Sequence, residues 1–241
     1  MKVTDKKRKY SVSVIIPCYN EEGNIEECIR RVPKLGSDTE IVVVDDGSKD
    51  ATADIIKKLR KRYKNLKLMS YFPNRGKGNA VRAGLNAAKG DVLIILDADM
   101  AVAPEEMNKF VKPLIDGKVG FTNGTRFIYK MEKGAMGKIN YIGNRLMGLL
   151  FTLAIGQKIT DSLCGTKALF RKDYKKIGIH KDDPWGDFSL IFGAARLGLK
   201  IQEISIHYKK RVAGKSKMKL IEHGTKLFYI WFRQFQQYRF Q

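Results

Sequence analysis

Two aspartates that follow an apolar run are the residues of this sequence best suited to chemistry. Asp97 and Asp99 come directly after the apolar run 93–96 and are separated by one residue. Two carboxylates at this spacing repel each other unless a cation or hydrogen-bond donors neutralise them. Hard oxygen ligands suit Mg²⁺ or Mn²⁺, which can bridge to a diphosphate. The pair therefore predicts a metal and diphosphate site, with a turn that contains two aspartates by chance as the alternative.

Polar residues also follow two earlier apolar runs. The sequence PCYNEE occupies 17–22, and DDGS occupies 45–48. Because the carboxyl ends of parallel strands meet at one edge of a sheet, we expect these loops to join Asp97 and Asp99 in one crevice. The loop 74–79 (NRGKGN) is either a phosphate loop ahead of a helix or a flexible turn. The chain has no GxGxxG and no GxxxxGK[ST], so a metal is expected to replace a glycine-rich phosphate cradle.

Short apolar runs alternate with helical patterns through the first half of the chain. We expect strands at 12–16, 41–44, 66–71, 92–96 and 119–122, and helices at 23–31, 51–63, 79–88 and 104–115. This alternation predicts an α/β protein with βαβ crossovers and a Rossmann-like, mostly parallel sheet flanked by helices. The pattern after residue 122 is less regular, and no domain boundary is indicated before about residue 211.

Composition limits the class of protein and its partners. The chain of 241 residues can form one sizeable core, and its formal charge of +21 favours nucleic acid, anionic lipid or phosphorylated ligands. A basic nucleic-acid-binding protein is the weaker alternative, since the chain has no helix-turn-helix, RNP or zinc signature. Cys18, Cys28 and Cys164 show no CxxC spacing, which fits a reducing compartment. With no signal-peptide pattern and no apolar stretch of about 18–20 residues, we expect a cytoplasmic protein that is not integral to a membrane.

Taken together, PCYNEE at 17–22, VVVDDGS at 42–48 and LDAD at 96–99 resemble the family 2 inverting glycosyltransferases with the GT-A fold. The resemblance is strongest to dolichol-phosphate mannose synthases and related polyprenyl-phosphate sugar transferases, and it covers about residues 11–217. It implies one catalytic domain, 1–217, that transfers a hexose from a nucleotide sugar to dolichyl or polyprenyl phosphate. It also implies Mg²⁺ or Mn²⁺ as cofactor, mannose as the favoured sugar and GDP-mannose as the favoured donor, with a UDP-sugar as the alternative.

The same resemblance assigns roles to individual residues. The nucleoside would be held by Pro17, Tyr19, Glu21 and Asp46, and the metal and diphosphate by Asp97 and Asp99. The cations expected to meet phosphate are Arg126, after the fifth strand, and Arg211 and Lys217 of a basic loop. Two further acidic candidates are Asp161, in a D-x-x-(C/S)-G segment, and Asp187, in a later sugar-facing region.

The sequence departs from the family pattern at two places. Ala101 stands where relatives commonly have a Gln near the metal, so the metal would keep more water or use another ligand. An arginine often precedes the helix that corresponds to 139–155; the nearest basic residues here are Lys138 and Arg145, and the sequence does not decide which of them takes its place. These departures leave donor and acceptor details open.

The acceptor decides whether a general base is needed. A phosphomonoester is already anionic near neutral pH and can attack the anomeric carbon without a strong base. His180, His207 and His223 are scattered and read as structural or surface residues. If the acceptor is instead a hydroxyl of a glycan or another molecule, Asp161 or Asp187 would be the base. Both acceptor classes remain open at this point.

Two apolar segments bear on membrane contact. The segment 146–155 is apolar nearly all round but too short to span a bilayer, which favours a core helix over a lipid-touching element. The segment 218–241 is basic, aromatic and amphipathic, with Leu220, Leu227, Trp231, Phe235 and Tyr238 at helical spacing. Such a helix can lie in a bilayer interface or dock on the domain. Peripheral attachment to the membrane surface, or a membrane-anchoring subunit, would bring the protein to its lipid.

Overall fold

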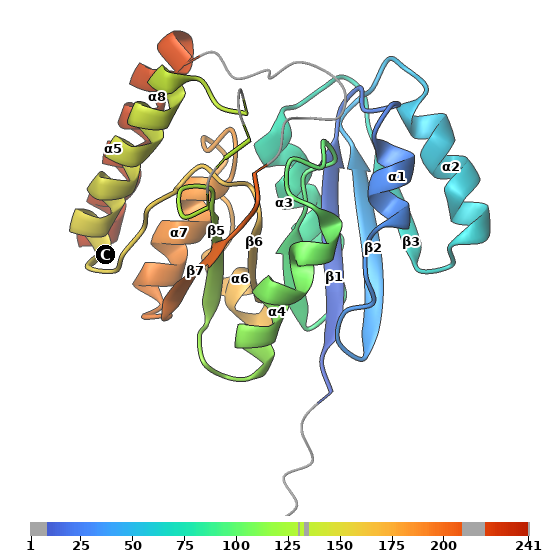
Figure 1. The fold of residues 1–241 in the computed structure, drawn as a ribbon, viewed down its shortest axis with the longest axis horizontal. Coiled ribbons are helices and arrows are strands. Elements are labelled where there is room, and N and C mark those ends of the chain that lie inside the picture. The colour runs from blue at the N-terminus through green and yellow to red at the C-terminus, as the bar shows by residue number, and fades with distance from the viewer. Residues whose placement is uncertain (1–8, 130, 133–134, 209–219, 241) are drawn as a thin grey trace, which may run out of the picture.

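The structure, a computed structural model, describes residues 9–129, 131–132, 135–208 and 220–240. Within these residues seven strands form one sheet in the order β3-β2-β1-β4-β6-β5-β7 (Figure 1). The first four strands are β1 (Ser11–Cys18), β2 (Asp38–Asp45), β3 (Leu66–Ser70) and β4 (Val92–Ile95). They pair in parallel, so their carboxyl ends share one edge of the sheet. The strands expected in this half are confirmed.

Helices cover both faces of these strands. One face carries α1 (Ile25–Arg30), α2 (Thr52–Arg62) and α4 (Met107–Ile115), which follows the short η1 (Pro104–Glu106), and the other face carries α3 (Lys77–Ala87). In β1, Val14 and Ile16 join the core beneath α1, while Ile15 joins the core beneath α3. Successive residues of a strand point to opposite faces, so a strand buried on both faces is apolar throughout.

The second half of the sheet contains one reversal. Its strands are β5 (Phe121–Thr125), β6 (Lys167–Phe170) and β7 (Ile201–Ser205), and its shorter helices are α6 (Arg171–Ile177) and α7 (Asp187–Arg196). Strand β6 enters between β4 and β5 and runs antiparallel to both, whereas β7 is parallel to β5. The irregular pattern after residue 122 reflects this reversal. The expected mostly parallel α/β sheet is confirmed.

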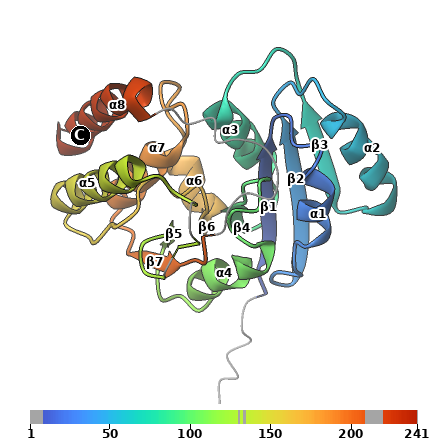
Figure 2. The same ribbon diagram turned by 45° about the horizontal axis from the view of Figure 1, so that its top comes forward.

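Two long helices lie next to each other at the β7 end of the sheet. They are α5 (Lys138–Ile155) and α8 (Leu220–Phe240), seen together in Figures 1 and 2. Phe192 of α7 lies 4.7 Å from the ring of Phe151 in α5 and 6.4 Å from that of Trp231 in α8, measured between centroids. The C-terminal helix is therefore docked on the domain through one of its sides.

The segment 146–155 of α5 is not buried on all sides. Phe151 and Ile155 are buried, but Leu146, Leu149 and Leu153 are exposed. The expectation that core packing alone accounts for this segment is wrong, because only one side of α5 meets the rest of the domain. Among the described residues, no helix combines the length and the apolar character needed to cross a bilayer.

Candidate active site

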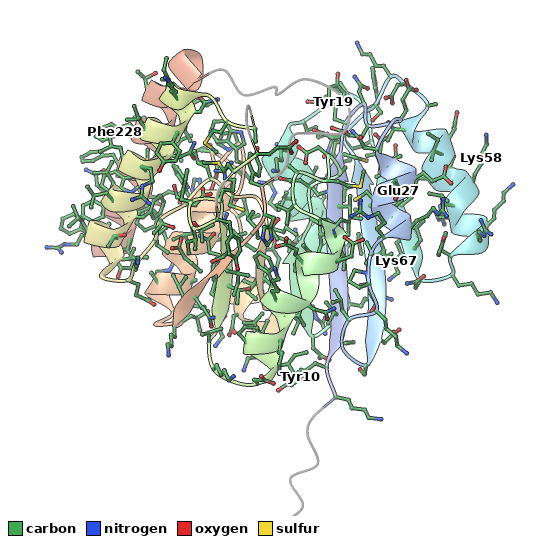
Figure 3. All side chains as sticks on the ribbon, viewed as in Figure 1. Tyr10, Tyr19, Glu27, Lys58, Lys67 and Phe228 are labelled. Carbon is green, nitrogen blue, oxygen red and sulfur yellow. The ribbon has the colours of Figure 1, made fainter. Side chains whose placement is uncertain are left out.

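The carboxyl ends of β2, β1 and β4 lie side by side at one edge of the sheet, and those of β1 and β2 are seen at its upper edge in Figure 1. The loops that leave these strands carry residues 19–22, 46–48 and 97–99. Figure 3 shows Tyr19 at this edge and Tyr10 at the opposite one. The three polar loops therefore meet in the region that the sequence indicates.

Asp46 is buried and ties the loop after β2 to the segment before α3. Its Oδ1 accepts a hydrogen bond from the backbone N–H of Arg75 at 2.8 Å, and its Oδ2 accepts one from Asn74 Nδ2 at 2.9 Å. Its own backbone N–H donates to the carbonyl of Cys18 at 2.9 Å. These bonds hold the loop 74–79 against the ends of β1 and β2, so this loop belongs to the site.

The other residues assigned to the nucleoside lie around the end of β1. Pro17 is buried within the strand, and Tyr19 is half-buried just beyond it. Glu21 donates its backbone N–H to Thr52 Oγ1 at 2.8 Å, and its carboxylate accepts a hydrogen bond from Asn24 Nδ2 at 2.7 Å. The structure thus gathers Pro17, Tyr19, Glu21 and Asp46 in one region, and their contact with a nucleoside stays a prediction.

Asp97 forms an ion pair with Lys77, the first residue of α3. Lys77 Nζ lies 2.6 Å from Asp97 Oδ1. Burial alone would lower the pKa of Lys77, but surrounding carboxylates raise it, in the order Asp97, Asp187 and Asp99. At Gly165 a Cβ would lie 2.5 Å from Asp97 Oδ2 and 2.7 Å from Lys77 Nζ, so a larger residue there would force the side chains of this pair to move.

Asp99 is buried, and its Oδ1 accepts a hydrogen bond from the N–H of Ala101 at 3.0 Å. The Ala101 side chain is apolar and supplies no metal ligand. Among the described residues no group of three Asp, Glu, His or Cys side chains is arranged to hold a metal. Mg²⁺ commonly binds through one or two carboxylates together with phosphate oxygens and water. The oxygens of Asp97 and Asp99 therefore fit a metal that arrives with a diphosphate.

Arg126, directly after β5, is held by a two-pronged pair with Asp161. Its Nε lies 2.6 Å from Oδ2 and its Nη2 lies 2.7 Å from Oδ1, while Nη2 also donates to Asn144 Oδ1 of α5 at 3.2 Å. Asp161 is fully buried. Burial alone would lower the pKa of Arg126, but the charge of Asp161 and its hydrogen bonds raise it. Asp161 thus fixes the orientation of a permanent cation at the β5 end.

Asp187, the first residue of α7, belongs to a second buried pair. Nζ of the fully buried Lys167 lies 2.6 Å from Asp187 Oδ1 and also donates to the carbonyl of Cys164. Burial raises the pKa of Asp187, and the ammonium groups of Lys167 and Lys77 oppose this shift. Since Gly165 touches Asp97, the segment 161–167 connects the β4 end of the site to both buried pairs.

Several residues of the site are absent from the sequence-based assignment. Lys77 lies in a loop noted there only for its glycines, and Lys167 closes the segment that begins with Asp161. Asn144 and Glu203 have no motif around them. Glu203 Oε1 accepts hydrogen bonds from the backbone N–H groups of Thr160 at 2.7 Å and Asp161 at 3.2 Å. Burial raises the pKa of Glu203.

Other residues considered from the sequence lie elsewhere or outside the described part. Arg211 and Lys217 are outside the described residues, as is the side chain of His223. His207 Nδ1 lies 3.1 Å from Glu106 Oε1. Arg145 lies near the site, with its Cζ 5.7 Å from the ring centroid of Phe127.

Residues 13–178 match the family described as glycosyl transferase family 2. An uncharacterized protein of Methanocaldococcus jannaschii is 34% identical over 203 residues, which cover 82% of this chain and 81% of that protein. The dolichyl-phosphate beta-glucosyltransferase ALG5D of Trichomonas vaginalis is 31% identical, over 95% of this chain and 77% of its own length. The undecaprenyl-phosphate 4-deoxy-4-formamido-L-arabinose transferase of Edwardsiella ictaluri is 30% identical, over 91% of this chain and 67% of its own length.

Solved structures of low sequence identity share the fold. Glucosyl-3-phosphoglycerate synthase of Mycobacterium tuberculosis, in complex with Mn²⁺, UDP-glucose and phosphoglyceric acid, has a TM-score of 0.71 at 21% identity and covers 94% of this chain and 80% of its own. Mannosyltransferase PcManGT of Pyrobaculum calidifontis, in complex with GDP-Man and Mn²⁺, has a TM-score of 0.64 at 20% identity, with coverages of 92% and 65%. The expected GT-A fold is confirmed. On the family match and these relatives, the chain belongs to glycosyl transferase family 2 and is a glycosyltransferase.

Proposed function

We propose that this protein transfers a hexose from a nucleotide sugar to a polyprenyl phosphate at a membrane surface. The observation that carries this proposal is the arrangement of charge at one sheet edge. Asp97 and Asp99 follow the end of β4, and Arg126 follows the end of β5. A metal-bound diphosphate can bind at the two aspartates, and a second anion can bind at Arg126. Relatives named dolichyl-phosphate beta-glucosyltransferase and undecaprenyl-phosphate transferase support a lipid phosphate as that second anion.

In this proposal Asp97 and Asp99 hold Mg²⁺ or Mn²⁺. Bound with the diphosphate, the metal would neutralise charge on the departing nucleoside diphosphate. Lys77 now forms an ion pair with Asp97 at 2.6 Å, so its ammonium occupies the place where a cation is needed. Lys77 then has to share Asp97 with the metal or turn toward the phosphates. The named complexes of related folds with Mn²⁺ support this assignment.

No residue has to act as a base when the acceptor is a phosphomonoester, because the attacking oxygen is already anionic. Arg126 would orient that phosphate, and Asp161 would act only through Arg126. Pro17, Tyr19, Glu21 and Asp46 would hold the nucleoside. The alternative acceptor, a hydroxyl group, requires Asp161 or Asp187 to accept a proton. Asp161 is paired with Arg126 and Asp187 with Lys167, so either carboxylate would have to give up its ion pair to take the proton, which disfavours this route.

We place glucose ahead of mannose as the transferred sugar. The sequence motifs favour mannose, whereas relatives at 31%, 30% and 28% identity are named dolichyl-phosphate beta-glucosyltransferases. UDP-glucose is therefore the first donor to test, and GDP-mannose the second. Peripheral attachment to the membrane, with or without an anchoring subunit, belongs to the same proposal.

The test is sugar transfer from radiolabelled UDP-glucose, GDP-mannose and UDP-N-acetylglucosamine. Each donor is incubated with Mg²⁺ or Mn²⁺, with and without dolichyl phosphate, and the organic-extractable label is counted. We expect lipid-linked label with one donor, absent when EDTA is added. Label transferred only to a soluble hydroxyl acceptor would reject the polyprenyl acceptor and keep the glycosyltransferase.

A further inference from the structure

The outer side of α5 carries an uninterrupted row of exposed apolar residues. Counted along the helix, the row has members at spacings of three, four, three and four residues, and they are 53–74% exposed: Ile139, Ile142, Leu146, Leu149 and Leu153. Residues at this spacing lie on one side of an α-helix, and the row extends over about 21 Å. Single exposed apolar residues are ordinary, but a continuous row marks an interaction surface.

The opposite side of α5 is attached to the active site. Asn144, on that buried side, accepts the hydrogen bond from Arg126 Nη2. Near the start of the helix, the ring of Tyr141 meets that of Phe127 edge-on, with centroids 5.2 Å apart. The apolar row therefore begins beside Arg126 and runs away from the active-site edge along the outside of the molecule (Figure 1).

Helix α8, which packs beside α5, carries exposed aromatic side chains of its own. Phe228, Tyr229 and Phe232 are exposed, while Leu227, Ile230 and Trp231 pack inward. Figure 3 shows Phe228 on the outer side of the molecule, at the opposite end from Lys58 of α2. We call the row of α5 together with these three aromatic residues the α5–α8 face.

Basic residues flank the α5–α8 face. On α5 and on residues 224–240 of α8 the charged side chains are Lys138, Arg145, Lys226, Arg233 and Arg239, and none is acidic. A cavity of about 440 Å³ lies between α8 and the start of α3, and its lining includes Arg75, Lys181, Lys226 and Arg233 beside Tyr229. Asp182 also lines the cavity and forms an ion pair with Arg233. The apolar face thus has a cationic margin.

This charge pattern selects the occupant of the face. A second copy of the chain would place the same basic margin against this one. Each copy has a formal charge of +21, so the two copies would repel each other. A bilayer with anionic headgroups offers the opposite charge beside an apolar interior. Aromatic and aliphatic side chains enter the boundary between headgroups and acyl chains, while Lys and Arg remain at the headgroups.

We propose that the α5–α8 face docks on an anionic phospholipid bilayer, with its apolar residues in the interface and the cationic cavity at the headgroups. The docking places Arg126 next to the membrane, where a polyprenyl phosphate presents its head. The biological use of the surface rests on the proposed function, but the docking itself does not. The proposed docking brings α5, as well as α8, into contact with lipid.

The test is cosedimentation of the full chain with vesicles of phosphatidylcholine alone or with about 30% phosphatidylglycerol, which gives the vesicle a negative surface potential. The apolar variant carries Ile142→Ser, Leu146→Ser and Leu149→Ser, and the basic variant carries Lys181→Gln and Lys226→Gln. The matched controls are Lys58→Gln with Lys61→Gln on α2, and Phe72→Ser, an apolar residue that is 71% exposed away from the face. Circular dichroism and size-exclusion chromatography establish that each variant is folded and report its oligomeric state.

We expect the wild type to bind the anionic vesicles, the apolar variant to lose at least tenfold in affinity, and the basic variant to lose about tenfold on anionic vesicles only. Both controls should bind as the wild type does. Equal binding by the apolar variant and the wild type overturns the proposal. A wild-type dimer that becomes a monomer in the apolar variant, with no vesicle binding by either protein, assigns the face to a second copy instead.

Transfer assays separate this proposal from the proposed function. The apolar variant should still transfer sugar to a short-chain prenyl phosphate in solution and lose transfer to a long-chain prenyl phosphate in vesicles. If the wild type binds vesicles but transfers sugar to neither prenyl phosphate, the docking surface is supported and the proposed acceptor is wrong. Equal loss of transfer to both acceptors, with vesicle binding intact, contradicts a role for the face in reaching the lipid.

Discussion

The carboxylates on the two sides of the active site are held in different ways. On the side of β1, β2 and β4, Asp46 and Asp99 accept hydrogen bonds from backbone N–H groups, and Asp97 pairs with the partly exposed Lys77. On the side of β5 and α7, Asp161 and Asp187 each bind a cation inside the protein. A carboxylate held by backbone donors keeps lone pairs for a ligand, whereas one buried against a cation is committed to that cation.

This difference separates ligand binding from positioning. We assign the metal and the diphosphate to the first side, because the ion pair described there, between Asp97 and Lys77, is partly exposed, whereas the two pairs of the second side are buried. The second side holds Arg126 and the segment 161–167 in place. Changes on the first side should therefore remove activity and leave the fold intact, while changes on the second side should affect both.

The largest expected effect is that of Asp97→Asn combined with Asp99→Asn. The double variant should lose at least about 1,000-fold in kcat/KM, because the metal-binding charges are removed while the shapes of the side chains are kept. Its Tm should stay within a few degrees of the wild type, since the Asp97–Lys77 pair is partly exposed and Asp99 accepts its described hydrogen bond from a backbone N–H group. Transfer kinetics and thermal denaturation check both parts. A large fall in Tm would show that Asp97 and Asp99 are structural.

The next largest effect is expected from Asp161→Asn, which leaves the Arg126 guanidinium buried with a neutral partner. Breaking a buried pair by removing one charge costs about 3–5 kcal/mol, so the free energy of unfolding should fall by that order. Transfer activity should fall as well, because Arg126 loses its orientation. Urea denaturation measures the first effect. If Asp161→Asn has the same free energy of unfolding as the wild type, the second side does not stabilise the fold more than the first side does.

Gly165→Ala tests the contact between the two sides. Its Cβ would lie 2.5 Å from Asp97 Oδ2, closer than carbon and oxygen can approach, so the carboxylate has to move. We expect a loss of about 10–100-fold in kcat/KM, with a raised requirement for metal, and a smaller loss of stability than in Asp161→Asn. The matched control is Gly156→Ala, whose Cβ would meet no atom within 4 Å, although its φ of +70° adds strain. If Gly165→Ala requires the same metal concentration as the wild type, Gly165 does not affect the metal site.

The smallest expected effect concerns pH. Burial, followed by the charge of Asp161, raises the pKa of the Cys164 thiol from 9.0 to about 12. Between these values the unfolded chain releases this proton and the folded chain keeps it, so stability falls as pH rises above 9. From pH 9 to pH 10 the free energy of unfolding of the wild type should fall by about 1 kcal/mol more than that of Cys164→Ala. Urea denaturation at both pH values measures this difference, and identical pH dependence would contradict an un-ionised, buried Cys164.

The side of the site that binds ligand is the side that sequence reasoning finds. The motifs PCYNEE, VVVDDGS and LDAD each lie where a strand ends, so a local pattern is enough to place Asp46, Asp97 and Asp99 at one edge. The buried pairs depend on contacts between distant segments. Nothing around Lys77 predicts its contact with Asp97, and nothing in β7 predicts that Glu203 holds the backbone of Asp161.

The same limit applies to the outer helices. The apolar segment 146–155 predicts a helix, but periodicity alone does not show which side of it meets the domain. A helix that is apolar on both sides looks like a core helix in the sequence. Only the packing of Phe151 inward leaves Leu146 and Leu149 on the surface.

The most direct test of the two-sided account is nucleotide binding measured by calorimetry. UDP and GDP are titrated with and without Mn²⁺ into the wild type, into Asp97→Asn with Asp99→Asn, and into Asp187→Asn. We predict that one of the two nucleotides binds the wild type only with the metal. That binding should be lost in the double variant and kept in Asp187→Asn where it is folded. Metal-independent binding of equal strength in all three proteins would contradict the assignment of the metal and diphosphate to Asp97 and Asp99.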